Sequence, residues 1–357
     1  MLIPTLFLVG GIGLLWVAAE WLIHGAASLG RAAGIPSIVI GLTVVSMGTS
    51  APELVVSALA ALRGSPDLAA GNVFGSNLAN IGLILGLAAL MKPLTVAAQA
   101  VRREVPWMLA VTLITYPLML NLRMGRVEGF ILAALLFVYL VFLIRLARRE
   151  AASLPPSRLP GSETAGAEAA LEQMEEMNVG GSPGAARGSE GAHPRPWGRA
   201  SGLRAHLPSI ALVIVGVAGL VVGGRGIVIG ATEVARLLGV PEVLLGLSVV
   251  AVGTSLPELA TTVIAALRGE SDLAVGNIVG SNIFNLTFVL GGTALLAPIS
   301  VNPLLLRVEY PAVLLLSLII LPMARSEGRI ARWEGVLLLL LYVAAWVWIL
   351  YARAVFA

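Results

Sequence analysis

The 357-residue chain contains no cysteine, one lysine and three histidines. The absence of cysteine excludes disulfides, thiolate chemistry and cysteine-ligated metals. His193 and His206 lie in or beside a polar segment, and His24 follows the first apolar run. We therefore do not expect a histidine-based metal site or a catalytic triad. No basic face interleaved with aromatic residues indicates nucleic-acid binding.

Charge is scarce as well, since charged residues make up 12% of the chain and hydrophobic residues 58%. The mean hydropathy of +0.93 is far above that of a soluble domain. Long runs approach the roughly 20 apolar residues that cross a bilayer. These runs are continuous rather than alternating, which favours helices over a β-barrel. The composition predicts an all-α polytopic membrane protein embedded in a lipid bilayer.

The chain also lacks a phosphate-binding loop and any recognisable pair of nucleophile and base. These absences argue against a nucleotide-driven pump and against an enzyme, and no cofactor is expected.

Ten apolar segments can be distinguished, five on each side of a polar stretch. That stretch, 147–206, is rich in Pro, Gly, Ser and Ala. Such a composition cannot bury a core, so we predict a flexible insert. The predicted domains are a first five-helix unit at 1–146, the insert at 147–206 and a second five-helix unit at 207–357. The segments lie near 2–23, 35–62, 68–91, 104–121, 127–146, 207–228, 240–267, 273–297, 306–323 and 333–352.

The two halves repeat one another. When the chain is shifted by 205 residues, Gly41–Gly64 overlays Gly246–Gly269, and 15 of those 24 positions are identical. Polar identities at a fixed spacing do not follow from general hydrophobicity. Because each half has an odd number of segments, the second half must enter the membrane from the opposite side. The repeat therefore predicts ten transmembrane helices in two inverted five-helix repeats, an architecture of many secondary transporters.

The basic residues predict the orientation. With both termini outside, sixteen basic residues lie on the inner side and seven on the outer side. Half of the sixteen belong to the insert and its flanks, and basic residues in a long loop influence the orientation less. We expect a multi-pass protein of the inner (plasma) membrane, with both termini outside and a cytoplasmic insert.

Each repeat carries a proline and a glutamate inside an apolar segment. Pro52 lacks an amide hydrogen and crowds the carbonyl of Gly48, so the helix should break around Ser46–Pro52. The same holds for the stretch from Ala251 to Pro257 in the second half. Carbonyl oxygens freed at this depth must be buried in protein or face a wet cavity, and a bound cation would also satisfy them.

Glu53 and Glu258 directly follow these two prolines. Carboxylates at bilayer depth are costly and usually mark an interior path. An inverted repeat should bring the two together near the midplane, where they repel unless a cation or proton lies between them. Oxygen-only ligands with flexible geometry suit Ca²⁺, which takes about 6–8 oxygens.

Polar residues also form a stripe on the following segment of each half. Residues spaced i, i+4 and i+8 lie along one helix face. For the four asparagines at 72, 77, 277 and 282, hydrogen bonding between helices and ion binding both stay open. For the deeper positions we favour ion binding: Ser76, Asn80, Ser281 and Asn285. Glu20 and Arg225 occupy equivalent places in the two repeats, and we expect them to act in helix packing.

"GLTVVSMGTSAPELVVS" with "GNVFGSNLAN", and "GLSVVAVGTSLPELATT" with "GNIVGSNIFN", closely resemble the paired alpha-repeats of the cation/calcium antiporters, in the sodium/calcium exchanger branch. The resemblance implies that the second, third, seventh and eighth helices form the ion sites. It implies that Glu53 and Glu258 are shared carboxylates and that Thr49 and Thr254 give backbone oxygens to Ca²⁺. It further implies a set of residues that bind Na⁺ or complete the centre: Ser50, Ser76, Ser255, Ser281, the carbonyls of Ser46 and Ala251, Asn80 and Asn285.

Two departures from the wider family bear on the counter-ion. Potassium-dependent members carry an acidic residue at the position of Asn285, so coupled K⁺ transport is not expected here. The proton/calcium branch has a Glu-His pair where this chain has Gly75-Ser76 and Gly280-Ser281. This favours a secondary antiporter that exchanges Ca²⁺ for Na⁺ by alternating access. An H⁺/Ca²⁺ antiporter that uses the same glutamates is the alternative, and a cation channel is a further one.

Overall fold

The computed structural model describes residues 2–33, 35, 37–98, 100–153, 203–237, 253–325 and 328–356. Most of the predicted insert and the start of the predicted segment 240–267, including Ala251, lie outside these residues. The described part is almost entirely helical, with four two-residue strands.

The first half contains α1 (Leu2–Ala33), α2 (Ser37–Ile40), η1 (Gly41–Val45), α3 (Ser46–Thr49), α4 (Ala51–Leu62), α5 (Pro66–Leu78), η2 (Ala79–Leu85), α6 (Gly86–Met91), β1 (Leu94–Thr95), η3 (Ala100–Glu104), α7 (Val105–Leu118), β2 (Arg123–Met124) and α8 (Arg126–Ser153). The second half contains α10 (Leu203–Leu237), α12 (Leu256–Arg268), α13 (Ser271–Phe284), η5 (Asn285–Val289), α14 (Leu290–Leu296), β3 (Ile299–Ser300), η6 (Leu305–Glu309), α15 (Tyr310–Arg325), β4 (Arg329–Ile330) and α16 (Arg332–Phe356). The η elements are π-helical turns.

Seven described helices are long and apolar enough to cross a membrane. An eighth span is formed if the two helices Ile38–Thr49 and Ala51–Leu62 are counted together, although they are bent by 42° at their junction. These lengths establish a polytopic membrane fold. They do not by themselves establish the ten predicted spans, because α7 is short and the residues before α12 are only partly described.

The core of the bundle consists of two helical rods, each with a π-helical turn in its middle. The rods are α5–η2–α6 and α13–η5–α14, and they cover Pro66–Met91 and Ser271–Leu296. Their most apolar stretches are 78% and 94% buried, whereas that of α16 is only 22% buried. The rods also carry the predicted polar stripes, which therefore lie inside the protein and away from lipid.

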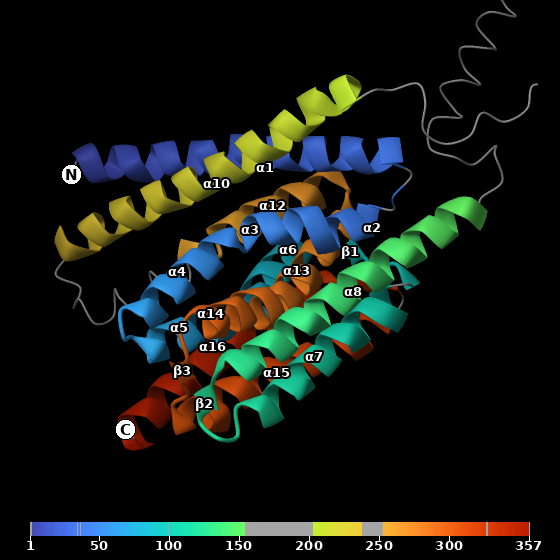
Figure 1. Ribbon diagram of the computed structural model, residues 1–357. Helices are drawn as coiled ribbons and strands as arrows, with labels where there is room; N and C mark the ends of the chain where they lie inside the picture. The colour runs from blue at the N-terminus through green and yellow to red at the C-terminus, as the bar shows by residue number, and fades with distance from the viewer. Residues whose placement is uncertain are drawn as a thin grey trace, which may run out of the picture.

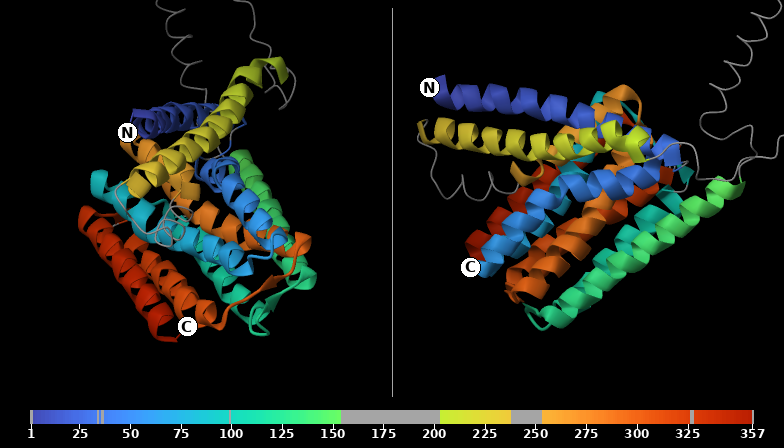
Figure 2. Two further views of the ribbon diagram at one scale, coloured as in Figure 1. Left: turned by 90° about the vertical axis from the view of Figure 1, so that its left-hand side faces the viewer. Right: turned by 45° about the horizontal axis from the view of Figure 1, so that its top comes forward.

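Helices α1 and α10 form a separate layer over this core. Figures 1 and 2 show them side by side along most of their length, at an angle to the other helices. Small residues allow this close approach. A Cβ on Gly11 would lie 2.8 Å from the carbonyl oxygen of Gly223, and one on Gly216 would lie 2.9 Å from that of Ala18.

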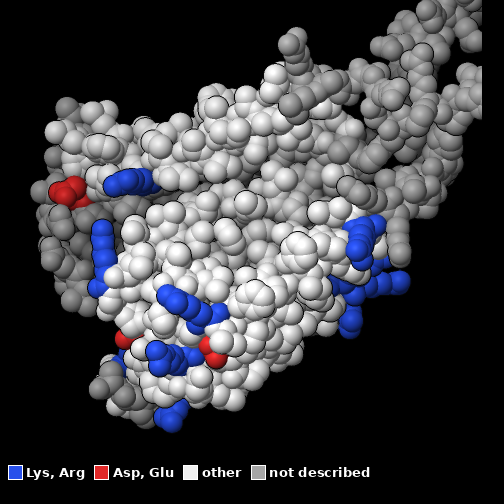
Figure 3. Space-filling model, viewed as in Figure 1, with Lys and Arg blue, Asp and Glu red and all other residues white. Residues whose placement is uncertain are grey.

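Two short antiparallel pairings join the halves of the chain. Strand β1 pairs with β4, and β2 pairs with β3. Figure 1 shows these pairings at opposite ends of the bundle. Figure 3 shows a broad face without charge between groups of basic side chains near the two ends, as expected for a protein that crosses a bilayer.

The packing of α16 against α6 predicts one effect on stability. A Cβ on Gly335 would lie 2.6 Å from the carbonyl oxygen of Gly86, which is backbone and cannot easily move. Gly335→Ala should therefore lower the stability by about 1–3 kcal/mol through overpacking. Gly13→Ala is the matched control, because nothing lies within 4 Å of its added Cβ. Thermal unfolding in detergent measures both, and equal unfolding midpoints would contradict the tight crossing.

Candidate cation site

The predicted helix breaks lie beside the two prolines. Ser50, between α3 and α4, has φ −83° and ψ 3°, and Ser255, before α12, has φ −87° and ψ 5°. Pro52 and Pro257 each take the second position of the helix that follows. At that position the missing amide hydrogen costs nothing, because the first amides of a helix have no partner within it.

Each break places a glutamate in the first turn of a new helix, Glu53 in α4 and Glu258 in α12. The N-terminus of a helix carries a partial positive charge, which favours a carboxylate there. Both side chains are 0% exposed. The chain thus holds two acidic groups away from solvent, at positions where the backbone partly supports negative charge.

Hydrogen bonds to these glutamates cross between the two halves. The hydroxyl of Ser50 donates to Glu258 Oε1 at 3.2 Å, and that of Ser255 donates to Glu53 Oε1 at 3.4 Å. The second oxygen, Oε2, of each glutamate has no hydrogen-bond partner among the described residues. Each half therefore supplies a hydroxyl to the other half's carboxylate and leaves one oxygen of that carboxylate unused.

The polar stripes on the two rods contain further unsatisfied atoms. The side chains of Ser76, Asn80, Ser281 and Asn285 are all 0% exposed. Their two hydroxyls and all four amide atoms have no partner among the described residues. Buried polar atoms without partners are rare because each one costs free energy. Here they belong to the residues that the sequence predicts as ion ligands, and their oxygens suit a hard cation.

Three of the four asparagines whose roles stayed open on sequence alone donate to another helix, whereas Asn282 donates to the carbonyl of Ile278 in its own helix. Asn72 Nδ2 donates to Ser57 Oγ at 3.0 Å, and Asn277 Nδ2 donates to Thr261 and Thr262 at 3.0 and 2.9 Å. Nδ2 of Asn77 donates to the carbonyl of Asn282 at 3.4 Å. These bonds support the packing interpretation for Asn72 and Asn277, whereas Oδ1 of Asn77 and of Asn282 has no partner among the described residues.

Ser46 takes part in the network differently from the prediction. Its carbonyl accepts from the amide of Ser50 at 2.9 Å and from the hydroxyl of Thr49 at 3.3 Å, so the break does not free it. Its own hydroxyl lies within hydrogen-bond distance of two carbonyls, that of Gly41 at 2.6 Å and that of Asn277 at 3.1 Å. The equivalent Ala251 lies outside the described residues.

Two structural features were missed by sequence reasoning. The first is the π-helical turn at Asn80 and at Asn285, in η2 and η5. Such turns are frequent at functional sites, and no local motif predicts them here. The second is a further pair of buried acids, Glu104 and Glu309, which are only 4% and 7% exposed. They do have a sequence signal, Arg-x-Glu-x-Pro, repeated 205 residues apart.

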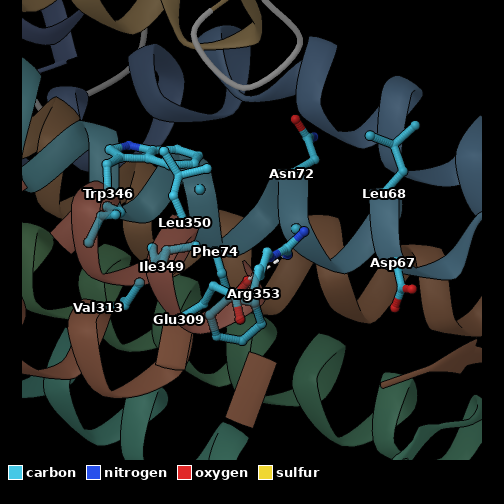
Figure 4. A pocket seen from close by; sticks show the side chains of 13 residues that line it. Asp67, Leu68, Asn72, Phe74, Glu309, Val313, Trp346, Ile349, Leu350 and Arg353 are labelled. Atoms are coloured by element: carbon cyan, nitrogen blue, oxygen red, sulfur yellow. Dashed lines mark hydrogen bonds and ion pairs between the residues drawn. The ribbon is translucent and has the colours of Figure 1, made fainter. Parts of the chain in front are cut away.

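These two acids have different partners. Glu104 accepts from the hydroxyl of Tyr139 at 2.9 Å, and Glu309 forms an ion pair with Arg353 of α16. Figure 4 shows Glu309 and Arg353 facing each other at a cavity of about 190 Å³, while Asn72, which also lines it, points away from them. The pair ties α16 to η6.

A family model described as "Sodium/calcium exchanger protein" matches residues 3–145 and 208–351. The two matched ranges cover both apolar halves and leave out the polar insert. The chain belongs to the sodium/calcium exchanger family. Its membership agrees with the resemblance of the repeated motifs and establishes a cation exchanger of the membrane.

Named relatives cover nearly the whole length of this exchanger-family chain. It is 37% identical over 346 residues to the inner membrane protein YrbG of Escherichia coli K12, with 95% of this chain and 94% of that one covered. It is 32% identical over 368 residues to the sodium/calcium exchanger MaX1 of Methanosarcina acetivorans, with 96% and 98% covered.

Solved structures of the sodium-calcium exchanger NCX_Mj have the same fold. The one soaked with 2.5 mM Na⁺ and 0.1 mM Ca²⁺ matches with a TM-score of 0.75 at 26% identity, covering 96% of this chain and 97% of that one. The all-helical membrane architecture predicted from composition is therefore confirmed at the level of the fold.

Proposed function

We propose that this protein is a secondary antiporter that exchanges Ca²⁺ for Na⁺ by alternating access, with Glu53 and Glu258 as shared ligands at the centre of the membrane. One observation carries the proposal. The atoms left without partners at the two helix breaks and on the two stripes belong to two carboxylates, two hydroxyls and four asparagine amides, all buried. A cation between the helices would satisfy their oxygens together.

The remaining proposed ligands lie near the two helix breaks and on the two stripes. The carbonyls of Thr49 and Thr254 complete the Ca²⁺ site, and the hydroxyls of Ser50 and Ser255 already contact the two carboxylates. The family resemblance implies that Na⁺ uses the same glutamates together with neutral oxygens: the side chains of Ser50, Ser76, Ser255, Ser281, Asn80 and Asn285 and the carbonyls of Ser46 and Ala251. The carbonyl of Ser46 already accepts two hydrogen bonds, and Ala251 lies outside the described residues.

The exchange is carried by ten helices in two inverted repeats, and paired contacts support this arrangement. The Ser50–Glu258 bond becomes the Ser255–Glu53 bond when each residue is replaced by its counterpart 205 positions away. The pairing of β1 with β4 likewise corresponds to that of β3 with β2, with an offset of 205 residues between β1 and β3 and of 206 between β2 and β4. A two-fold relation between the halves produces such exchanged pairs.

The positions of the chain ends support the predicted orientation. Figure 1 shows both termini at one end, and the end of α8 and the start of α10, which flank the insert, at the other. With the insert in the cytoplasm, both termini are outside. The inner-membrane relative from Escherichia coli supports the inner (plasma) membrane as the location.

Na⁺ is favoured over H⁺ as the counter-ion by the neutral side chains. Protons would need only the two glutamates, whereas Na⁺ also needs oxygens such as those of Ser76 and Ser281. These two hydroxyls are buried without partners, so their presence supports Na⁺. The relative MaX1 is itself named a sodium/calcium exchanger.

Removing either central charge should stop exchange. Glu53→Gln and Glu258→Gln should each lower ⁴⁵Ca²⁺ uptake into proteoliposomes by about 100-fold or more, because charge–charge interactions are strong where water is excluded. Glu104→Gln is the matched control, since it removes a buried carboxylate outside the site and glutamine can still accept from Tyr139. Near wild-type uptake by a folded Glu53 or Glu258 variant would remove that residue from the site.

The paired serines test the counter-ion. Ser76→Ala with Ser281→Ala should weaken the Na⁺ dependence of exchange by about tenfold and Ca²⁺ binding much less, because the carboxylates that hold Ca²⁺ remain. Raising Na⁺ should also lower the apparent Ca²⁺ affinity of the wild type. Suppose instead that wild-type Ca²⁺ flux follows a pH gradient, ignores a Na⁺ gradient and is untouched by the double substitution. The H⁺/Ca²⁺ alternative would then replace Na⁺.

A further inference from the structure

We propose that Asn72 and Asn277 are positioning residues, each of which fixes the threonine at the helix break of the opposite repeat. The inference rests on the proposed function, in which the carbonyls of Thr254 and Thr49 bind Ca²⁺. The side chains of these threonines are not ligands in this scheme. Instead, each asparagine hydrogen-bonds to a threonine hydroxyl and thereby restrains the carbonyl of the same threonine.

The hydrogen bonds run in a crossed pattern. The hydroxyl of Thr254 donates to Asn72 Oδ1 at 3.2 Å, and that of Thr49 is shared between Asn277 Oδ1 at 3.4 Å and the carbonyl of Ser46 at 3.3 Å. The amide nitrogen of each asparagine is anchored within its own repeat, that of Asn72 on Ser57 and on the carbonyl of Glu53. Each asparagine thus links its own rod and helix to the break of the other repeat.

Both threonines lie at the helix breaks, where the link affects the carbonyls that are proposed to bind Ca²⁺. Thr49 is the last residue of α3, and Thr254 directly precedes the break at Ser255. Backbone at a break has fewer helical hydrogen bonds to hold it. A threonine has few side-chain rotamers, so an anchored hydroxyl restricts the peptide attached to the same Cα. The asparagines therefore set the direction of the carbonyl oxygens.

Double-mutant cycles on Ca²⁺ affinity separate this role from simple helix packing. Asn72→Ala and Thr254→Val should each raise the Kd for Ca²⁺ about tenfold, and together they should be no worse than the stronger single variant. The effects of Asn72→Ala and Thr49→Val on the Kd should multiply when the two changes are combined, because these residues share a repeat but not a hydrogen bond. Thr254→Ser should restore the wild-type Kd, since it keeps the hydroxyl.

The proposal would be overturned if the effects of Asn72→Ala and Thr49→Val on the Kd were not independent. It would also be overturned if the effects of Asn72→Ala and Thr254→Val multiplied. Binding is measured by the shift of thermal unfolding with Ca²⁺ concentration, separately from transport. A wild type that binds Ca²⁺ but does not exchange it would refute the proposed function, while the binding cycles would still decide the role of the asparagines.

A different observation supports a second inference: we propose that the Glu20–Arg268 ion pair stabilises one of the two conformations of the transport cycle. Arg268 Nη2 lies 2.7 Å from Glu20 Oε1, and the pair joins α1 to the end of α12. Glu20 lies within the apolar span Ile3–Gly30, where a charged side chain is costly without a partner.

The repeat has no mirror image of this pair. The positions related to Glu20 and Arg268 by 205 residues are Arg225 of α10 and Arg63 at the end of α4, both arginine. In an inverted repeat, alternating access exchanges the conformations of the halves. The contact between α1 and α12 is then lost, and its counterpart brings Arg225 toward Arg63. Attraction in one conformation is thus replaced by repulsion in the other.

This asymmetry predicts that two substitutions on different helices act in the same direction. Glu20→Gln removes the existing pair, and Arg225→Glu creates its mirror image with Arg63. Each should shift the ratio of the two conformations about fivefold toward the other one, as expected for a partly exposed ion pair. Arg63→Gln should cancel most of the effect of Arg225→Glu, and Glu20→Gln should have no further effect in an Arg268→Gln background.

The absence of native cysteine allows a direct measurement of the ratio. Spin labels on Ile12→Cys of α1 and Leu340→Cys of α16, both exposed, report the populations as distances in reconstituted protein. Unchanged distances in the Glu20→Gln variant would overturn the proposal. So would an effect of Arg225→Glu that persists in the Arg63→Gln background. Neither result depends on the identity of the counter-ion.

Discussion

Everything in this fold depends on placing two carboxylates where water cannot reach them. A bilayer requires every backbone and side-chain polar group to find a partner inside the protein. Glu53 and Glu258 meet this requirement with one oxygen each and leave the other unpaired. The helix breaks, the helix N-termini behind the glutamates and the polar stripes on the buried rods all bring partial charges to this point. In the proposed function, a bound cation satisfies these unpaired oxygens.

The crossed hydrogen bonds explain why both halves are needed. A single repeat would carry a buried glutamate without the hydroxyl that the other repeat supplies. Away from the centre the halves have diverged, as Glu104 with Tyr139 and Glu309 with Arg353 show. The two halves thus match at the proposed cation site and differ at this second pair of acids.

Features caused by residues close together in the sequence could be predicted, whereas features that depend on distant residues could not. The breaks beside Pro52 and Pro257 were predictable, because proline acts on its own helix. The crossed partners of Asn72 and the π-helical turn at Asn80 were not, because they depend on residues some 200 positions away or on packing. The acids at 104 and 309 were overlooked because neighbouring arginines suggested a membrane surface. First-helix length was also underestimated, since α1 continues to Ala33 rather than ending near residue 23.

The net charge of the proposed site determines which cations it can hold. Two carboxylates surrounded by neutral oxygens are balanced by one Ca²⁺ or by two monovalent cations. With asparagine rather than an acid at positions 80 and 285, no third carboxylate adjusts this balance among the proposed ligands. Each further Na⁺ would have to be held by the neutral hydroxyls and carbonyls alone. In the proposed mechanism Ca²⁺ and Na⁺ compete for these two carboxylates, and one kind of cation must leave before the other can bind. Mutual exclusion at a site that can face either side of the membrane is the physical condition for coupled exchange.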